Sequence, residues 1–369
     1  MNPIIDNIYK NKPVLITGHT GFKGSWLAIW LKELGANVIG YALDPPSEPN
    51  NFEATRLQEE ITHIHGDIRD LDRLKETFEK YRPEFVFHLA AQPLVRLSYD
   101  EPKLTLDTNI GGTVNVCEAV RKTSSVKVLV SITSDKCYEN REWVWGYREN
   151  DPMGGHDPYS ASKGAMEIVC SAYLRSFFAK AGRGPHIGFA TARAGNVIGG
   201  GDWGKDRLIP DCIRALSNHQ PIGIRSPHAV RPWQHVLEPL GGYLLLGAAL
   251  RRDPSKYSGA WNFGPENSSH LTVAEMAERL IKYWGEGAWS DLSDQKAPHE
   301  ANLLKLNCDK VHAALNWYSI LKIDECLQMT VEWYKAFYEG PKTKSMYQFS
   351  ASQIRNYTNR MTVNKVMRT

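Results

Sequence analysis

The sequence predicts an α/β fold in which a doubly wound parallel sheet carries a smaller C-terminal lobe. Two observations support this fold class. From Pro13 to about Ala194, short apolar runs rich in β-branched residues alternate with stretches of helical period, which is the pattern of a parallel sheet with helices on both faces. Beyond about residue 195, Gly, Pro and Trp become more frequent and the alternation fades. We therefore expect a regular first half followed by a lobe built from inserted pieces.

Six apolar runs are expected to form the strands of the sheet, namely residues 14–17, 37–43, 61–65, 85–89, 126–133 and 187–193. Between the first two, residues 25–34 carry an apolar stripe with helical spacing, and Gly35 follows as a C-terminal cap. Further helical patterns cover residues 273–283 and 323–338. The polar segment after Gly340 has no clear pattern, so it either packs on the body or frays.

The charge and cysteine content exclude several classes of function. Lys and Arg number 44 against 41 Asp and Glu, a net charge of +3, and neither sign forms a long run, so nucleic acid and membrane surfaces are not expected partners. The longest apolar run, residues 241–250, is too short to cross a bilayer. The first residues lack a signal-like pattern, so we expect a cytoplasmic protein. The six cysteines lack metal-ligand spacing, which predicts buried thiols and no metal.

A glycine-rich turn at residues 17–24 joins the first expected strand to the first expected helix. Glycines in such a turn let the backbone approach a pyrophosphate at the helix N-terminus. Asp44 ends the second strand, about 20 positions after Gly24. At this place a carboxylate accepts hydrogen bonds from the adenosine ribose and repels a 2′-phosphate. The sequence therefore predicts NAD as the cofactor. The residues expected to bind it here are Gly18, His19, Gly21, Phe22, Lys23, Gly24 and Asp44.

His19 is unusual in this turn, because its imidazole stands where the backbone must come close to phosphate. Two outcomes remain open at this point. Either the bulk of the ring loosens or shifts the cofactor, or the ring points to solvent and has no effect on binding.

The turn, which reads Thr-Gly-x-x-Gly-Phe-x-Gly, resembles that of the extended short-chain dehydrogenase/reductase family. The resemblance implies two further sets of NAD contacts, Asp67 and Ile68 after the third strand and Leu89, Ala90 and Ala91 after the fourth. We therefore assign residues 1–194 to an NAD-binding Rossmann-type domain. Residues 195–369 are assigned mainly to a substrate lobe, with some segments returning to the first domain.

Tyr159 and Lys163 form the expected catalytic pair. They lie one helical turn apart, after Asp157 as a candidate N-cap and Pro158 as the first helical residue. A nearby ammonium lowers the pKa of a phenol, so we expect Tyr159 to accept a proton near neutral pH and Lys163 also to bind the nicotinamide ribose. Three further Tyr-x-x-x-Lys pairs occur, but only this one follows a core strand that ends in hydroxyl residues, among them Ser134.

The run Ser134-Asp135-Lys136 distinguishes between reactions. It resembles the Thr-Asp-Glu run of nucleotide-sugar 4,6-dehydratases, in which elimination of water needs both an acid and a base, whereas a 4-epimerase needs neither. By this resemblance Asp135 is the acid and Lys136 the base. A lysine accepts a proton only when neutral, and burial beside Lys163 would lower its pKa in that direction. Alternatively, Lys136 stays charged, holds Asp135 and steadies the developing enolate.

Lysine at this position resembles the CDP-glucose 4,6-dehydratases, as do residues 87–99, 193–203, 207–216 and 231–240. The resemblance implies CDP-glucose as the favoured substrate and deoxysugar synthesis for surface polysaccharides such as O-antigen as the setting. Cationic and amide side chains suit a nucleotide diphosphate. The expected substrate-binding residues are Gln92, Asn196, Arg207, Arg231 and His299.

The implied reaction begins with transient oxidation at C4 of the sugar, continues with loss of water across C5 and C6, and ends with reduction at C6. NAD is then neither consumed nor released. Two other functions remain open, a nucleotide-sugar 4-epimerase and a non-catalytic sensor of NAD redox state. The resemblance also implies a homodimer or a dimer of dimers, formed through the helix that carries Tyr159 and the one spanning residues 103–122.

Overall fold

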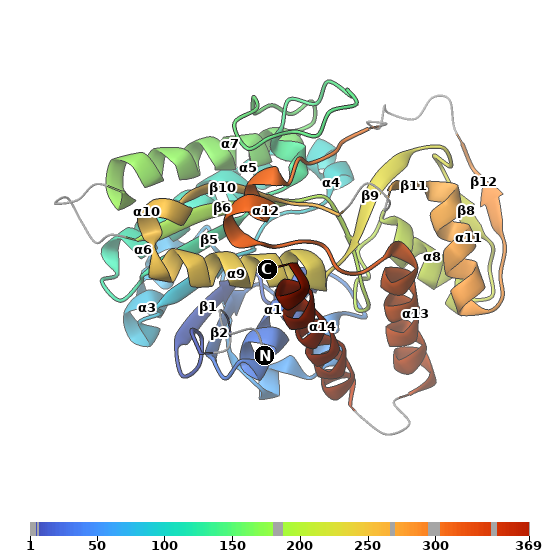
Figure 1. Ribbon diagram of the computed structural model, residues 1–369, viewed down its shortest axis with the longest axis horizontal. Coiled ribbons are helices and arrows are strands. Elements are labelled where there is room, and N and C mark those ends of the chain that lie inside the picture. The colour runs from blue at the N-terminus through green and yellow to red at the C-terminus, as the bar shows by residue number, and fades with distance from the viewer. Residues whose placement is uncertain are drawn as a thin grey trace.

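A seven-stranded sheet forms the body of the molecule, and every pair of neighbouring strands in it is parallel (Figure 1). The computed structural model describes residue 5 and residues 7–179, 187–265, 270–293, 303–340 and 345–368. The strand order is β10-β6-β5-β4-β1-β2-β3. The strands are β1 (Pro13–Thr17), β2 (Asn37–Ala42), β3 (Thr62–His65), β4 (Phe85–His88), β5 (Val128–Ile132), β6 (Gly188–Ala194) and β10 (Gly259–Phe263).

The chain order reverses at β1, which pairs with β2 on one side and with β4 on the other. In such a sheet, the carboxyl ends of the two strands border a crevice where ligands bind. All six strands expected from the sequence are confirmed, with ends shifted by one or two residues. The seventh strand, β10, comes from the second half of the chain and pairs with β6.

Helices cover both faces of the sheet, because its strands are apolar on both sides. Val14 and Ile16 of β1 belong to one buried cluster, together with α1 (Phe22–Glu33) and α9 (Leu237–Arg252). The intervening Leu15 belongs to a second cluster on the opposite face. The helices of that face are α3 (Leu71–Tyr81), α6 (Gly112–Lys122) and α7 (Pro158–Tyr173).

The second lobe lies beyond the carboxyl ends of the strands, at the right of Figure 1. It contains a three-stranded sheet in the order β11-β9-β7 and a two-stranded sheet of β12 and β8. Its strands are β7 (Asn196–Ile198), β8 (Ile222–Ile224), β9 (Val230–His235), β11 (His270–Thr272) and β12 (Trp289–Asp291). Its helices are α8 (Leu208–Ser217), α11 (Val273–Trp284) and α13 (Ile323–Glu339), the last two close to the patterns at 273–283 and 323–338.

Short helices complete the chain: α2 (Asn51–Ala54), α4 (Val95–Asp100), α5 (Pro102–Leu106), α10 (Pro254–Tyr257) and α12 (Asp309–Leu315). Single 3₁₀ turns cover Leu57–Glu59 and Asp135–Cys137, and single π-helical turns cover Asp107–Gly111 and Leu174–Phe178. Within the described ranges, no helix is both long and apolar enough to span a membrane.

The segment after Gly340, which the sequence left open, forms α14 (Met346–Arg368) and packs against α1 (Figure 1). Tyr357 meets the ring of Trp30 edge to face, with centroids 5.6 Å apart. Arg355 forms an ion pair with Glu33 at 2.6 Å. The outer face of the first helix is therefore covered by a helix from the far end of the described chain.

Candidate active site

The glycine-rich turn lies where β1 meets α1, as expected, and its glycines are required by close backbone contacts. Gly18 has a φ of +79°, and a Cβ there would stand 2.7 Å from the backbone of Ala90. A Cβ on Gly24 would stand 2.1 Å from the carbonyl oxygen of Gly18. The turn therefore folds tightly on itself and against the end of β4, directly before the N-terminus of α1. These features fit an NAD cradle.

His19 does not point to solvent, and that alternative is wrong. Its side chain is fully buried, with Nε2 2.7 Å from Nδ1 of His63 and the ring edge-on to Phe52. The ring has room because a Cβ on Gly40 of β2 would fall 2.3 Å from its Cγ. Burial, followed by the neighbouring His63, lowers the pKa of His19 to about 3. The imidazole is therefore neutral and anchors the turn to the second and third strands.

The other residues expected to contact NAD lie around the same crevice. Asp44 follows β2, and its exposed carboxylate lies 3.6 Å from Nε2 of His65. The carboxylate of Asp67 accepts hydrogen bonds from the backbone and guanidinium of Arg69, while Ile68 is buried. Leu89 and Ala90 adjoin the turn through hydrogen bonds from their backbone amides to Thr17. Phe22 is partly buried and packs on the first core cluster, and Ala91 is also partly buried.

Tyr159 and Lys163 lie on α7 as the sequence predicted. Asp157 caps the helix by accepting a 2.8 Å hydrogen bond from the amide of Ser160, and Pro158 is the first helical residue. Both catalytic candidates are buried, with 9% and 3% of their surface exposed. The Lys163 ammonium stands 5.9 Å from the centre of the Tyr159 ring. The pair therefore faces a common interior site.

The expected fall in the pKa of Tyr159 is absent from this structure. Burial raises that pKa to about 12; the hydrogen bond with Ser134 opposes the rise, and the charge of Asp135 adds to it. Lys163 is itself affected by burial and by the charge of Lys23, which together lower its pKa to about 8. The physical reason is that removal of the phenol from water outweighs the hydrogen bond with Ser134 and the charge of Arg207, both of which lower the pKa of Tyr159.

Ser134 and Asp135 follow β5 directly and are both buried. The Ser134 hydroxyl donates a 3.0 Å hydrogen bond to Oδ1 of Asp135, and the other carboxylate oxygen would lie 3.0 Å from a Cβ on Gly195. Burial raises the pKa of Asp135, although Lys136 and Ser134 act against the rise. Asp135 is therefore a buried carboxyl group that binds a proton more readily than an exposed aspartate does. Lys136 follows on the same turn and is partly buried.

Lys23, expected only as a cofactor contact, also lies within electrostatic reach of the catalytic groups. Burial and the charge of Arg207 lower its pKa to about 8, while Asp135 and Asp202 raise it. The ammonium therefore lies among groups from the turn, the strand end and the second lobe. The sequence signal was a cation inside a glycine-rich turn, which does not reveal the direction of the side chain.

The expected substrate residues are only partly brought together. Arg207 precedes α8, pairs with Asp202 at 3.0 Å and is close enough to Tyr159 for their charges to interact. Asn196 begins β7 and lies opposite Trp233 of β9. Arg231 lies on β9, and its guanidinium donates a hydrogen bond to the carbonyl of Val230.

Gln92, another expected substrate contact, makes its side-chain hydrogen bonds within the protein. Both amide hydrogens of Gln92 are used within the protein, by the Leu94 carbonyl and the Thr105 hydroxyl. Gln92 therefore holds its own loop, a role that a local motif could not show. His299 falls outside the described residues.

Comparison with known proteins agrees with this geometry. The model of the NAD dependent epimerase/dehydratase family matches residues 14–264. A CDP-glucose 4,6-dehydratase of Salmonella typhimurium is 51% identical over 335 residues, which cover 90% of this chain and 93% of that protein. Among solved structures, an epimerase from Methanothermobacter thermautotrophicus is 26% identical with a TM-score of 0.76, covering 91% of this chain and 96% of the other.

A dTDP-glucose 4,6-dehydratase from Bacillus anthracis, solved in complex with NAD, shares the fold with a TM-score of 0.73 at 20% identity, over 89% of this chain and 98% of that one. The family match covers most of the parallel sheet together with the glycine-rich turn, Ser134, Tyr159 and Lys163. The chain belongs to the NAD dependent epimerase/dehydratase family.

Proposed function

We propose that this protein is a 4,6-dehydratase that converts CDP-D-glucose into CDP-4-keto-6-deoxy-D-glucose and water. One observation supports this function above all: a buried carboxyl group, Asp135, lies at the end of β5 with its pKa raised. It is held by the hydroxyl of Ser134, next to the Tyr159 site. An epimerase that oxidises and reduces the same carbon has no need of such an acid, whereas the loss of water does.

The proposed cofactor is NAD, which when bound would supply a reversible hydride acceptor. The turn at residues 17–24 would bind its pyrophosphate through backbone amides, which Gly18 and Gly24 allow to approach. Asp44 would hold the adenosine ribose. We propose further contacts from His19, Phe22, Lys23, Asp67, Ile68, Leu89, Ala90, Ala91, Tyr159 and Lys163.

In the proposed mechanism, Tyr159 takes the proton from the 4-hydroxyl of the sugar while Ser134 donates a hydrogen bond to the same oxygen. The ketone formed at C4 acidifies the C5 hydrogen, which Lys136 removes as a proton. Asp135 donates its proton to the 6-hydroxyl, and the C6–O bond breaks with loss of water. The hydride removed from C4 ends on C6, and a proton returns to C5. No net oxidation occurs.

The substrate would lie between the strand ends and the second lobe. Arg207, with its charge near Tyr159, suits a diphosphate, and Asn196 and Arg231 are proposed to bind the nucleotide. We place His299 in the same proposal on the sequence alone. The 51% identical relative named a CDP-glucose 4,6-dehydratase favours cytidine as the base. We also propose a role in deoxysugar synthesis for surface polysaccharide.

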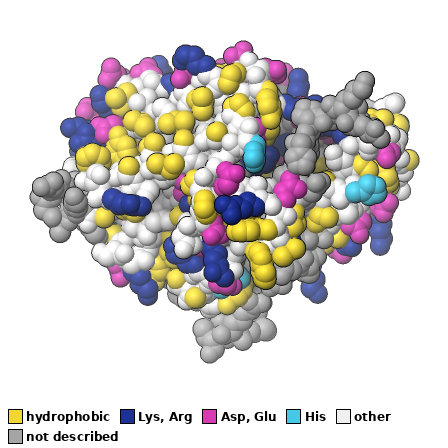
Figure 2. All heavy atoms as spheres, turned by 90° about the horizontal axis from the view of Figure 1, so that it is seen from above, with side chains coloured by type: hydrophobic (Ala, Val, Ile, Leu, Met, Phe, Trp, Pro, Cys, Tyr) yellow, Lys and Arg dark blue, Asp and Glu magenta, His cyan; other side chains and the backbone are white. Residues whose placement is uncertain are grey.

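We further propose that the protein assembles as a homodimer or a dimer of dimers through α7 and the region of α5 and α6. Four large apolar side chains are exposed on or beside these helices, Tyr99, Leu106, Ile168 and Phe177. Figure 2, seen from above Figure 1, shows hydrophobic side chains spread over one face of the molecule. The cysteines are free, buried thiols, which suits a reducing compartment such as the cytoplasm.

The decisive experiment incubates the protein with CDP-glucose and NAD and analyses the sugar by NMR and mass spectrometry. The expected product has lost one water and carries a ketone at C4 and a methyl group at C5. Formation of CDP-galactose would instead support an epimerase. Failure to convert any nucleotide hexose would contradict an enzymatic function and favour a sensor of NAD redox state.

A further inference from the structure

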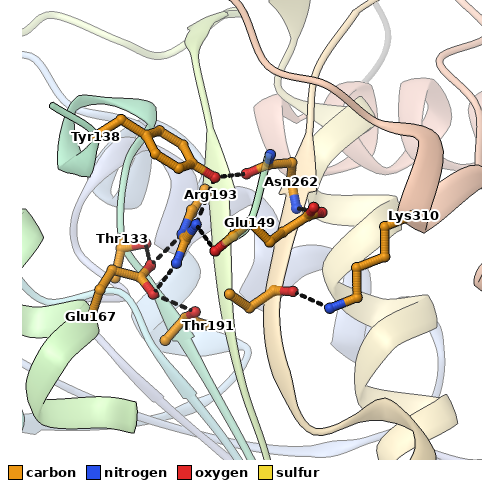
Figure 3. Close-up of polar contacts among 9 residues, drawn as sticks. Thr133, Tyr138, Glu149, Glu167, Thr191, Arg193, Asn262 and Lys310 are labelled. Carbon is orange, nitrogen blue, oxygen red and sulfur yellow. Dashed lines mark hydrogen bonds and ion pairs between the residues drawn. The ribbon is translucent and has the colours of Figure 1, made fainter. Parts of the chain in front are cut away.

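Glu167 has a buried carboxylate that the proposed mechanism does not use. It lies on α7, one turn beyond Lys163, and forms an ion pair with Arg193 of β6 in which the two side chains are 4% and 3% exposed. Each carboxylate oxygen also accepts a hydrogen bond from a threonine hydroxyl, one from Thr133 at 2.5 Å and one from Thr191 at 2.8 Å (Figure 3). Each oxygen of the Glu167 carboxylate therefore accepts two hydrogen bonds, one from a threonine hydroxyl and one from the Arg193 guanidinium.

The two threonines come from different parts of the sheet. Thr191 is in the middle of β6, which carries none of the proposed catalytic groups. Thr133 follows β5 and directly precedes Ser134, Asp135 and Lys136. Through Thr133, Glu167 ties the helix that carries Tyr159 and Lys163 to the strand end that carries the other three catalytic candidates.

The same network holds the other end of the catalytic turn. The Arg193 guanidinium donates to the Tyr138 hydroxyl at 2.6 Å and to the Glu149 carbonyl at 3.0 Å. The Tyr138 hydroxyl in turn donates to the side chain of Asn262 at 2.8 Å. Figure 3 shows the Tyr138 hydroxyl between the guanidinium of Arg193 and the side chain of Asn262 from β10. The turn formed by Ser134, Asp135 and Lys136 is thus fixed before its first residue and after its last.

A buried ion pair is weak evidence for stability, because removing two charges from water costs much of what their attraction returns. The threonine hydroxyls add directed hydrogen bonds to this pair, and the one from Thr133 joins the two elements whose side chains must meet around one sugar. Catalytic geometry is sensitive to such links, since a misplacement of about 1 Å can lower the rate about 100-fold.

We propose that Thr133 and Glu167 are positioning residues that set the acid and base of the strand end, Asp135 and Lys136, against Tyr159 and Lys163 on α7. The inference rests on the roles proposed for those four residues in dehydration. Neither Thr133 nor Glu167 is proposed to contact the reacting atoms of the sugar. Their part is to keep oxidation at C4 and elimination at C5 and C6 within reach of one bound sugar.

The test compares Thr133→Val with Thr191→Val in the full-length protein loaded with NAD. Both substitutions replace a buried hydroxyl that donates to Glu167 with a methyl group of similar size, so they should lower the melting temperature similarly. Only Thr133 adjoins the catalytic turn. We expect Thr133→Val to lower kcat for CDP-glucose about 10- to 100-fold with KM nearly unchanged, whereas Thr191→Val should lose about threefold or less.

The intermediate released on acid quenching distinguishes a positioning role from a general loss of stability. With Thr133→Val, acid quenching should release a 4-keto sugar that has kept its 6-hydroxyl, because Tyr159 still acts while elimination is slowed. Thr133→Ser, which restores the hydroxyl, should recover most of the rate. If Thr133→Val fails to fold, Thr133→Ala removes the same hydrogen bond without adding a methyl group and carries the same expectation.

Equal loss of kcat in the two valine variants, or full activity in Thr133→Val, would overturn the inference and leave the proposed function standing. Loss of kcat without recovery in Thr133→Ser would overturn it as well. A wild-type protein that converts no nucleotide hexose would overturn the proposed function itself. The control reaction of the wild-type protein therefore tells the two failures apart.

Discussion

Nε2 of His19 and Nδ1 of His63 lie 2.7 Å apart beneath the glycine-rich turn. This contact joins the turn to β3, and Phe52 covers the pair. The phosphate-binding backbone is therefore tethered to the sheet by a side chain, where a glycine would leave it free to adjust to a ligand.

The first prediction follows from this tether. His19→Gly should tighten NAD binding about tenfold, or about 1.4 kcal/mol, because the backbone between Gly18 and Gly21 could then approach the pyrophosphate. Isothermal titration with NAD measures the dissociation constant. His63→Leu removes the hydrogen bond but keeps the His19 ring, so a similar gain there would assign the effect to the tether, and no gain would assign it to the ring itself. An unchanged constant in His19→Gly would contradict the prediction.

The second prediction concerns two glycines of the same turn. Gly24→Ala should strongly destabilise the fold and abolish NAD binding, because its Cβ would stand 2.1 Å from a backbone carbonyl oxygen. Gly21→Ala is the matched control, because its Cβ would meet only the Gly18 carbonyl oxygen, at 3.4 Å. Thermal unfolding without cofactor measures the difference. Equal melting temperatures for the two variants would show that the turn can relax.

The third prediction tests the base. Lys136→Met should leave the transient oxidation at C4 largely intact and abolish dehydration, because the side chain keeps its length and loses its amine. Chemical quenching followed by mass spectrometry measures the keto sugar with and without its 6-hydroxyl. Asp135→Asn is the companion variant and should stop the loss of water from the acid side. A fully active Lys136→Met enzyme would remove this lysine from the mechanism.

The fourth prediction concerns Glu238, which is fully buried on α9. Its carboxylate accepts hydrogen bonds from the backbone amides of Ile320 and Leu321 and from the Tyr357 hydroxyl. Burial raises its pKa from 4.5 to about 7, although these hydrogen bonds act against the rise. Between those pH values, the folded state keeps a proton that the unfolded state releases, so this stabilisation is lost as pH rises through about 7.

Glu238→Gln has no such proton. Its amide oxygen can still accept from the backbone amides of Ile320 and Leu321, and its NH2 group can donate to the Tyr357 hydroxyl, which reverses that one hydrogen bond. The free energy of unfolding of the wild type should therefore fall relative to Glu238→Gln between about pH 4.5 and pH 7, by about 3 kcal/mol, and stay level above that range. Urea titrations at several pH values measure this difference. A constant difference across the range would show that Glu238 does not change its protonation.

The strands of the sheet could be predicted from sequence because each one is an apolar run that repeats with its helix in a fixed order. The strand β10 was missed, since Gly259–Phe263 reads locally like any short apolar segment. Its place beside β6 depends on a pairing between residues far apart in the chain. The helix after Gly340 was also beyond prediction, because its apolar residues follow no clear helical face.

The candidate site was predictable where its signals are local. Tyr159 and Lys163 share a capped helix that follows a strand ending in hydroxyl residues, so the local sequence indicated this pair. Asp135 was indicated by the resemblance of its run to that of the 4,6-dehydratases. The direction of His19 depended on the space above a distant glycine in β2. The raised pKa of Tyr159 depended on how completely the fold excludes water there. Such quantities arise only after the elements have packed.

The contact of α1 with α14 also has a consequence for synthesis. Glu33 and its partner Arg355 are 322 residues apart, and translation at about 5–20 residues per second leaves roughly 15 to 65 seconds between them. During that interval α1 lacks the contacts that Trp30 and Glu33 make with α14. The helix that follows the glycine-rich turn is therefore made early, and its packing is completed only after α14 has been made.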